Sequence, residues 1–260
     1  MEYLRIIVIV FSAIFGAAFG SFACCQAWRI RLKEEGKKDP GRRSVCLNCG
    51  KRLTWYENIP IISWILQGGK CRKCGKKIGK AEILAEVFGA VSFGLIAWRF
   101  LSAGTINYIG FSLVLLMIVG MLLLAIYDAK WQEMPVVVLV YVIIMGLALA
   151  VLGIVQTGVS MNGILSLLGS VALLAGTYYL LYLFSKERLV GEGDWMLCLA
   201  IGLALGKWQL ALVELFLANF IGSIVMVGLG KKKAAFGPFL VIAFVAIVVL
   251  EDVIMHYLSF

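Results

Sequence analysis

Two aspartates lie beside long apolar segments, where an ionisable side chain is costly and therefore indicates function. Asp128 follows one apolar run, and Asp194 closes the Gly-x-Gly-Asp stretch that begins at Gly191 and includes Gly193. Two carboxylates held close together cannot both ionise, so one can take a proton from water while the other polarises a carbonyl. The pair is predicted to be catalytic in an aspartic protease, with the two glycines letting a substrate strand approach. Capping of a helix by Asp194 is the alternative for that motif alone.

Four cysteines form two Cys-x-x-Cys pairs, Cys46 with Cys49 and Cys71 with Cys74, separated by 21 residues. A Gly follows each pair and permits a tight turn with positive φ. This spacing is typical of a structural zinc site with four thiolate ligands, which leave no open position for catalysis. Two disulfides, or four reduced thiols, are the alternatives, and a cytoplasmic location disfavours the disulfides.

The elements that must position these residues are membrane-spanning helices. Of the 260 residues, 62% are hydrophobic and 15% are charged, and the apolar residues gather in runs of the length that crosses a bilayer as a helix. We expect an all-α polytopic membrane protein with about eight spans, the sixth of them short, and a seven-span arrangement is the alternative. The expected spans are Leu4–Ala23, Ile83–Leu101, Tyr108–Tyr127, Pro135–Val155, Met161–Phe184, Trp195–Gly206, Gln209–Leu229 and Phe236–Tyr257.

Basic residues predict the orientation of the spans and account for the net charge of +9. With the amino terminus outside, the outer side receives only Arg5, Arg99 and Lys207. The inner side receives the basic segment from Arg29 to Lys80, together with Lys130, Lys186, Arg188, Lys231, Lys232 and Lys233. The charge is thus interpreted as topology, with lipid contact and no nucleic acid partner. Both aspartates then fall at the cytoplasmic boundary of the membrane.

The chain is predicted to have three parts. Residues 1–30 form the first transmembrane helix, 31–81 a cytoplasmic zinc-binding domain, which the family resemblance given next associates with methyl transfer, and 82–260 the transmembrane peptidase domain. The middle part is polar and basic, and it is too short to bury much core without a metal staple.

These features together resemble the type IV prepilin peptidases, a family of Gly-x-Gly-Asp membrane aspartic proteases that also N-methylate their products. The resemblance covers nearly the whole chain. It rests on the following segments: Gly20-Ser21-Phe22 with Arg29, the stretch from Cys46 to Cys74 with Asn58–Trp64 inside it, Glu82, Asp128 with Pro135, Gly191–Asp194, and Phe236–Leu240.

The resemblance implies an activity, cofactors and partners. A prepilin or pseudopilin precursor, made for a type IV pilus or for protein secretion, would lose its leader at the cytoplasmic face of the bacterial inner membrane. Its new amino terminus would then be methylated from S-adenosylmethionine. Ser21, Arg29 and Glu82 are the expected methyl-transfer or cofactor residues, whereas Glu86 is interpreted as a residue of the membrane interface.

Two other functions remain open from the sequence. One is a relative that cleaves without methylating. The other is a polytopic transporter or scaffold carrying a zinc ribbon, in which the mid-span Glu214 would relay protons.

Overall fold

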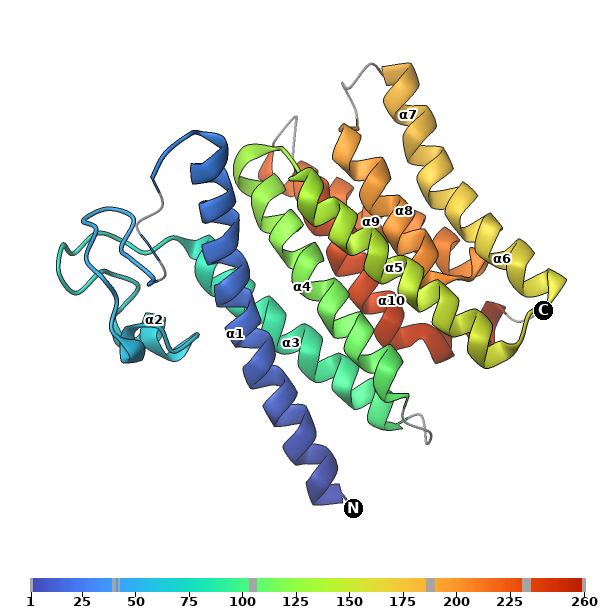
Figure 1. Cartoon of the computed structure of the whole chain (residues 1–260), viewed down its shortest axis with the longest axis horizontal. Coiled ribbons are helices and arrows are strands. Elements are labelled where there is room, and N and C mark those ends of the chain that lie inside the picture. The colour runs from blue at the N-terminus through green and yellow to red at the C-terminus, as the bar shows by residue number, and fades with distance from the viewer. Residues whose placement is uncertain are drawn as a thin grey trace. The chain divides into compact units, whose positions relative to one another are not determined.

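The computed structural model describes residues 2–38, 41, 43–102, 107–185, 190–230 and 235–258. The described residues form helices, turns and two isolated β-bridges, without a strand (Figure 1). The expected all-α fold is confirmed. The helices are α1 (Glu2–Glu34), the 3-10 turn η1 (Trp55–Glu57), α2 (Ile62–Leu66), α3 (Lys80–Ser102), α4 (Tyr108–Trp131), α5 (Val136–Thr157), α6 (Met161–Val171), the π-helical turn η2 (Ala172–Gly176), α7 (Thr177–Ser185), α8 (Glu192–Leu205), α9 (Trp208–Leu229) and α10 (Gly237–Leu258).

Seven helical segments among the described residues are long and apolar enough to cross a membrane. They are α1, α3, α4, α5, the continuous Met161–Ser185 segment, α9 and α10. The expected sixth span is α8, which has 14 residues. At 1.5 Å per residue it is roughly 21 Å long, shorter than the roughly 30 Å hydrocarbon core of a bilayer. The short helix foreseen there is present, and the seven-span alternative matches the count of long helices.

The chain forms two compact units, Met1–Ser102 and Ala103–Phe260. In the first unit α1 packs along α3 through residues that lack bulky side chains. A Cβ added at Gly20 would lie 2.7 Å from the Ala85 carbonyl carbon and 2.8 Å from Glu86 Cα, so the two backbones touch. Gly16 meets Gly89 in the same way, one turn along. Small residues four apart are the usual means by which membrane helices approach closely. The predicted functional boundaries at residues 31 and 82 stay predictions.

The second unit is a bundle of α4 to α10 in which the short helix α8 packs against several neighbouring helices. Gly146 of α5 lies against the backbone of Ala200, and the Ser170 hydroxyl donates a 2.8 Å hydrogen bond to the Gly202 carbonyl. Leu197 and Ile201 on α8 have no exposed surface. Protein therefore surrounds α8, which is how a helix too short to cross alone is held in an apolar bundle.

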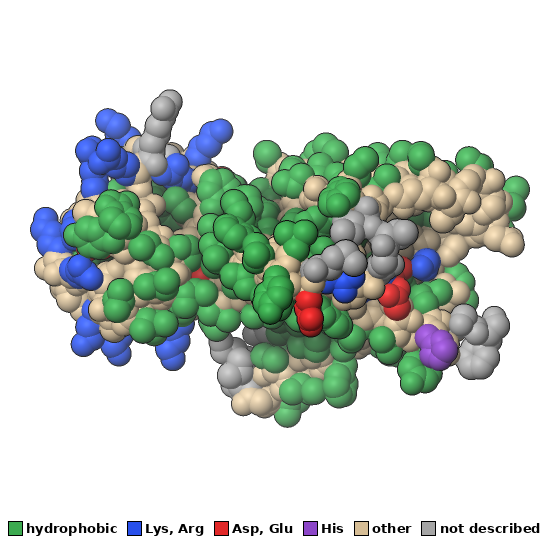
Figure 2. Space-filling model, turned by 90° about the horizontal axis from the view of Figure 1, so that it is seen from below, with side chains coloured by type: hydrophobic (Ala, Val, Ile, Leu, Met, Phe, Trp, Pro, Cys, Tyr) green, Lys and Arg blue, Asp and Glu red, His purple; other side chains and the backbone are tan. Residues whose placement is uncertain are grey.

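The segment between α1 and α3 differs from the long helices in the composition of its surface. Lys and Arg side chains gather over the residues between α1 and α3, whereas hydrophobic side chains cover most of the visible helical surface (Figure 2). Apolar surface on the long helices is expected where lipid is the solvent. Several basic residues used to predict the orientation, namely Lys186, Arg188 and Lys231 to Lys233, lie outside the described residues.

Candidate functional site

Asp128 lies in the last turn of α4 and is buried, with 7% of its surface exposed. Its Oδ2 accepts a 2.8 Å hydrogen bond from the backbone N–H of Gly237, at the start of α10. The helix ends just beyond it, because Gln132 takes up left-handed backbone angles and donates its N–H to the Asp128 carbonyl. The acid is thus held by a residue 109 positions away in the chain.

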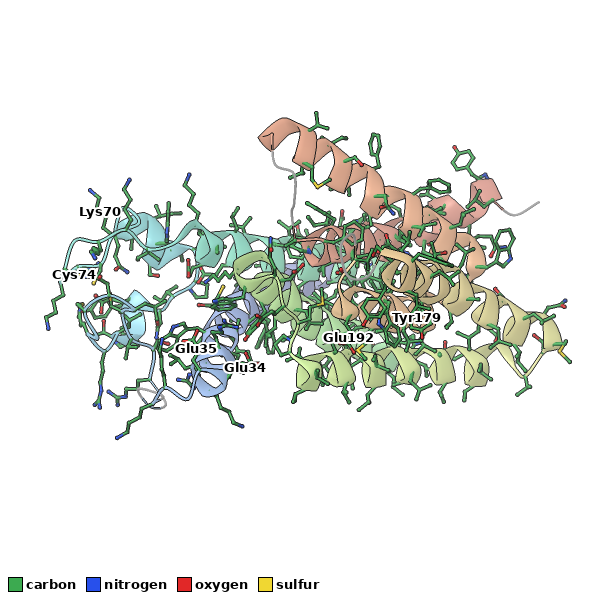
Figure 3. The ribbon with its side chains drawn as sticks, turned by 90° about the horizontal axis from the view of Figure 1, so that it is seen from above. Glu34, Glu35, Lys70, Cys74, Tyr179 and Glu192 are labelled. Atoms are coloured by element: carbon green, nitrogen blue, oxygen red, sulfur yellow. The ribbon has the colours of Figure 1, made fainter. Side chains whose placement is uncertain are left out.

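Asp194 lies in the first turn of α8 and is also buried, with 8% exposed. Its Oδ2 accepts a 2.9 Å hydrogen bond from the Gly191 N–H, while its own N–H donates to the Gly191 carbonyl. Gly191 occupies the N-cap position of α8, so Asp194 is not the N-cap considered from the sequence; it is the third residue of the helix and bonds back to the N-cap N–H. Tyr179 of α7 lies beside this end of α8 near Glu192, and its ring packs edge-on at 5.3 Å against Trp195 (Figure 3).

Met134, in the short connection between α4 and α5, packs against residues next to both aspartates. A Cβ added at Gly193 would lie 2.7 Å from Met134 Cβ, so the thioether side chain fills the space that this glycine leaves. A Cβ added at Gly237 would lie 2.9 Å from both Met134 Cε and Asp128 Oδ2. The end of α4 and the starts of α8 and α10 therefore meet around one methionine.

The two carboxylates share this junction without being bonded to each other. Each accepts from a backbone N–H, and no hydrogen bond between the acids occurs among the described residues. The charge of Asp194 nevertheless acts on Asp128 through space. Two buried carboxylates in electrostatic contact can divide the roles of proton acceptor and proton donor.

Four cysteines of the first unit form a cluster suited to a metal. The Sγ atoms of Cys46, Cys49, Cys71 and Cys74 all lie within 4.8 Å of one another, and those of Cys46 and Cys74 are 3.9 Å apart. Four sulfurs about 2.3 Å from a tetrahedral Zn²⁺ would be about 3.8 Å apart, so the donor set fits that ion. The thiols are free of disulfides.

The two knuckles repeat one backbone arrangement. The Cys46 N–H donates to the Lys51 carbonyl at 2.9 Å, and the Cys71 N–H donates to the Lys76 carbonyl at 2.9 Å. The glycines after the second cysteines, Gly50 and Gly75, have φ of 66° and 69°, as predicted. Hydrogen bonds from the Lys76 backbone and the Asn48 side chain lower the pKa of Cys74 to about 6, which favours the thiolate that a metal needs.

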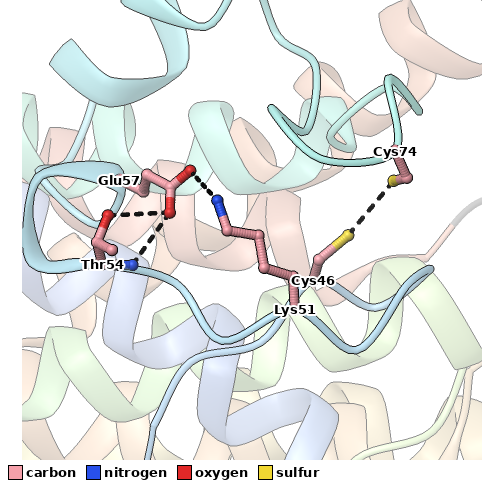
Figure 4. A network of polar contacts seen from close by, with 5 residues as sticks. All are labelled: Cys46, Lys51, Thr54, Glu57 and Cys74. Carbon is pink, nitrogen blue, oxygen red and sulfur yellow. Dashed lines mark hydrogen bonds and ion pairs between the residues drawn. The ribbon is translucent and has the colours of Figure 1, made fainter.

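A buried ion pair fixes the chain next to the first knuckle (Figure 4). The Lys51 ammonium donates to Glu57 Oε1 at 2.7 Å, and Glu57 Oε2 accepts from the N–H and the hydroxyl of Thr54 at 3.1 and 2.9 Å. These bonds, led by that from Lys51, lower the pKa of Glu57 to about 2. The carboxylate thereby closes the loop that leads from the metal cluster to η1.

The residues expected to serve methyl transfer lie on α1 and α3. Glu86 accepts a 2.7 Å hydrogen bond from the Ile61 N–H, and the Ser21 side chain lies close enough to interact with its carboxylate. Ile61 has φ of 63°, a strained value for a β-branched residue, so Glu86 holds a costly backbone conformation in place. The interpretation of Glu86 as a simple interface residue overlooked this role.

The other two expected residues are placed differently. Glu82 lies one turn before Glu86 and close enough for its charge to act on it. Arg29 lies about two turns beyond Ser21 on α1, and its guanidinium donates a 2.8 Å bond to the Gly41 carbonyl. Ser21 and Glu82 thus lie near Glu86, while Arg29 fastens the chain that leaves α1.

Glu214 lies in the middle of α9 and is fully buried. Neither of its carboxylate oxygens has a hydrogen-bond partner among the described residues. Its charge reaches Tyr178 and Cys198, and the Tyr178 hydroxyl accepts from the Asn219 amide at 2.9 Å. A proton-relay acid of a transporter would face a partner or an aqueous path, and the described surroundings supply no bonded partner.

Comparison with known proteins gives two family matches, one in each compact unit. The bacterial peptidase A24 N-terminal domain matches residues 14–100, and the type IV leader peptidase family matches residues 115–227. The second match includes both buried aspartates, and the first includes the cysteine cluster. No solved structure matches the chain.

Individual relatives agree with these matches. A prepilin leader peptidase/N-methyltransferase of Dichelobacter nodosus is 32% identical over 203 residues, covering 77% of this chain and 68% of the relative. One of Vibrio cholerae is 32% identical over 217 residues, covering 79% of each. One of Pseudomonas aeruginosa is 29% identical over 231 residues, covering 84% of this chain and 75% of the relative. With both halves matched in order and these relatives covered over more than two thirds of their length, the chain belongs to the type IV leader peptidase family.

Proposed function

We propose that this multi-pass membrane protein removes the leader peptide from type IV prepilin-like precursors and N-methylates the residue that becomes the new amino terminus. The observation that carries the proposal is the junction at Met134, which gathers Asp128 and Asp194 from helices far apart in sequence. Relatives named prepilin leader peptidase/N-methyltransferase support the same pair of reactions.

Cleavage follows from the chemistry of the two acids. The ionised aspartate removes a proton from water, and the oxygen of that water adds to the scissile carbonyl, which the protonated aspartate polarises. The tetrahedral intermediate then collapses, its C–N bond breaks, and the proton passes to the leaving amine. The N–H groups of Gly191 and Gly237 stabilise the ionised carboxylates, so either acid can hold the charge in turn.

Methyl transfer needs a site that attracts cations, since the methyl donor is a sulfonium and the new amino terminus is an ammonium. Glu82, Glu86 and Ser21 of the first unit supply two carboxylates and a hydroxyl within one region of the α1–α3 pair. A carboxylate there would take the proton that the amine must lose, leaving the nitrogen lone pair free to accept a methyl group. S-adenosylmethionine, when bound, would supply that methyl group and leave as the neutral thioether. Arg29 would support the chain beside this site.

The cysteine cluster is proposed to hold zinc as a structural ion. Four thiolates from Cys46, Cys49, Cys71 and Cys74 complete a tetrahedral shell, so the metal would fix the fold of the loop and take no part in the reaction. The loop is rich in exposed basic residues and buries little hydrophobic core among the described residues. A structural metal would supply the stability that such a core otherwise provides.

The location is proposed from the basic residues. If each of the eight expected spans crosses the membrane once, Arg29, Arg31, Lys80 and Lys130 lie on one side, and Arg5, Arg99 and Lys207 lie on the other. Because positive residues favour the cytoplasmic side, we propose that the zinc loop and both aspartates lie at the cytoplasmic face of the bacterial inner membrane. Lipid is the expected surrounding there, and no nucleic acid partner is proposed.

The direct test is to incubate the purified protein in lipid nanodiscs with a prepilin-type precursor and S-adenosylmethionine. Mass spectrometry of the product should show loss of the leader and gain of one methyl group on the new amino terminus. Asp128→Asn and Asp194→Asn should leave the precursor intact. Cleavage without the added methyl would support a protease-only relative, and cleavage by both variants would refute the aspartate mechanism.

A further inference from the structure

We propose that the loop between the zinc knuckles is an interfacial membrane anchor that inserts apolar side chains into a bilayer surface of anionic lipid. The anchor comprises η1 and α2 with the residues between them, and its apolar side chains, here called the interfacial patch, are Trp55, Ile62, Ile65 and Leu66. The proposal concerns how the first unit meets the membrane and does not depend on peptidase activity.

The interfacial patch is exposed on a part of the chain that is otherwise polar. Trp55 is 79% exposed, and Ile62, Ile65 and Leu66 are 54%, 62% and 72% exposed. The last three lie at i, i+3 and i+4 and therefore share one face of α2, which packs against η1. Four large apolar side chains are thus exposed on two touching turns, and clustered exposed apolar groups of this kind mark an interaction site.

A hydrogen bond sets the depth of α2 along the membrane helices. Glu86 accepts the N–H of Ile61, the residue that precedes α2, at 2.7 Å. Glu86 is the seventh residue of α3, about 9 Å along that helix from Lys80. On α1 the neighbour of Glu86 is Gly20, which still belongs to the apolar stretch of that helix. The start of α2 therefore lies level with apolar parts of both spans.

The surface of α3 at this depth is apolar and exposed. Leu84 and Val87, on either side of Glu86 in sequence, are 65% and 41% exposed on α3. These two residues belong to a helix long and apolar enough to cross the bilayer, so their exposed surface has lipid as its solvent. A patch tied to the same level meets the boundary between acyl chains and headgroups, where Trp is favoured.

The positive charge around the interfacial patch indicates that the membrane surface it meets is anionic. From residue 43 to residue 80 the chain has nine Lys and Arg residues and one acidic residue, Glu57, which is already paired with Lys51. The basic side chains are Arg43, Lys51, Arg52, Lys70, Arg72, Lys73, Lys76, Lys77 and Lys80, and all except Lys51 are exposed. Arg72 lies 5.4 Å over the ring of Tyr56, next to Trp55. Exposed apolar anchors surrounded by cations are complementary to anionic headgroups.

The same charge argues against a precursor leader as the occupant. A surface carrying eight exposed cations would repel any leader with a net positive charge. A lipid anchor also explains why Ile61 is held in a strained conformation. The bond to Glu86 fixes the angle at which α2 leaves the spans and so keeps the interfacial patch at the membrane surface.

The test uses the full-length protein in nanodiscs made with phosphatidylcholine brominated either near the headgroup end or deep in the acyl chain. The contribution of Trp55 is the difference in fluorescence between the wild type and Trp55→Phe. Shallow bromines should quench this difference signal more than deep ones, and acrylamide in water should quench it weakly. Adding phosphatidylglycerol at low salt should increase the lipid quenching.

Matched variants separate the patch from the fold of the loop. Ile65→Ser combined with Leu66→Ser should reduce the lipid quenching of Trp55 at least about twofold while the zinc content is unchanged. Leu47→Ser, which removes another exposed apolar side chain outside η1 and α2, should leave the quenching as it was. Strong acrylamide quenching with no effect of brominated lipid would overturn the proposal. Protection from both quenchers would mean that protein covers the patch, and would overturn it as well.

Discussion

The cysteine cluster of the first unit and the aspartate junction of the second are assembled by different means. The four thiols come from two short knuckles within 29 residues of chain, and each knuckle forms from its own backbone hydrogen bonds. The aspartate junction is formed by residues of α4, α8 and α10. Its hydrogen bond from Gly237 to Asp128 joins residues that are 109 positions apart in the sequence. One site can form locally when its metal binds, whereas the other exists only after a bundle has packed.

This difference implies that the two activities can be lost separately. A metal-bound loop folds with its ion, so its failure should stay within the first unit. Close packing around Gly193 and Gly237 positions the two aspartates. Small steric changes in the second unit should therefore lower the rate of cleavage. The following variants test that separation.

The largest effect is expected from Asp128→Asn and Asp194→Asn. Loss of a positioned acid or base typically costs 10²–10⁴-fold, so leader removal should slow at least about 10³-fold in each variant. Methylation of a synthetic peptide that already carries the mature amino terminus should continue at the wild-type rate. A variant that still cleaves at more than about a tenth of the normal rate would break the assignment.

The complementary variant is Cys71→Ser combined with Cys74→Ser. Loss of two thiolates should abolish zinc binding, measured by metal analysis of the purified protein, and should reduce methylation at least about tenfold. Cleavage should stay within about threefold of the wild type, because the peptidase junction lies in the other compact unit. Equal loss of both activities would show that the two units do not act separately.

A smaller effect is expected from Gly237→Ala. The new Cβ would lie 2.9 Å from both Asp128 Oδ2 and Met134 Cε, so the carboxylate must shift. A displacement of this size should slow cleavage about 10–10²-fold. The matched control is Gly153→Ala on α5, where an added Cβ meets nothing within 4 Å. If the two variants cleave at the same rate, the junction does not position the acid.

Glu57→Gln should weaken the loop without touching the peptidase. The change removes a charged hydrogen bond from Lys51 and should lower the stability of the loop by about 1–3 kcal/mol, measured as faster zinc loss to a chelator. Folding lowers the pKa of Glu57 from 4.5 to about 2, so its contribution is complete above pH 4.5 and is lost as the pH falls toward 2. Unchanged zinc loss at pH 7 would contradict this role.

The smallest effect on activity is expected from Glu214→Leu. The carboxylate is fully buried and its oxygens lack hydrogen-bond partners among the described residues, so an apolar replacement should raise stability by about 1 kcal/mol. The measurement is the midpoint of thermal unfolding in detergent. Cleavage should be unchanged, with Glu214→Gln as the control that keeps a polar group. Loss of cleavage in the leucine variant would show that Glu214 contributes to the peptidase reaction and would contradict this prediction.

Local features of both units could be predicted from the sequence. The cysteine spacing and the positive φ of Gly50 and Gly75 follow from the chemistry of a single turn. The helices could be predicted too, because lipid requires every backbone group in an apolar run to be bonded within its own segment. The positions of Asp128 and Asp194 at helix ends followed from those runs.

The contacts that hold the acids could not be predicted in the same way. Met134 fills the space at Gly193 and Gly237, and neither contact can be predicted from the spacing of residues along the chain. Glu86 is a similar case, since its bond to Ile61 depends on how the loop folds back onto α3. Packing between distant segments determines which residues come into contact. Composition and periodicity indicate only which face of a helix is apolar.

The most direct test of separate sites is to follow both products in one reaction of the Cys71→Ser, Cys74→Ser variant with a precursor and S-adenosylmethionine. Intact-mass spectrometry over time distinguishes precursor, cleaved product and methylated product. The account predicts that cleaved but unmethylated product accumulates at nearly the wild-type rate. A reaction in which the precursor stays uncut, in a protein whose bundle unfolds at the normal temperature, would contradict the separation of the metal-stapled unit from the aspartate site.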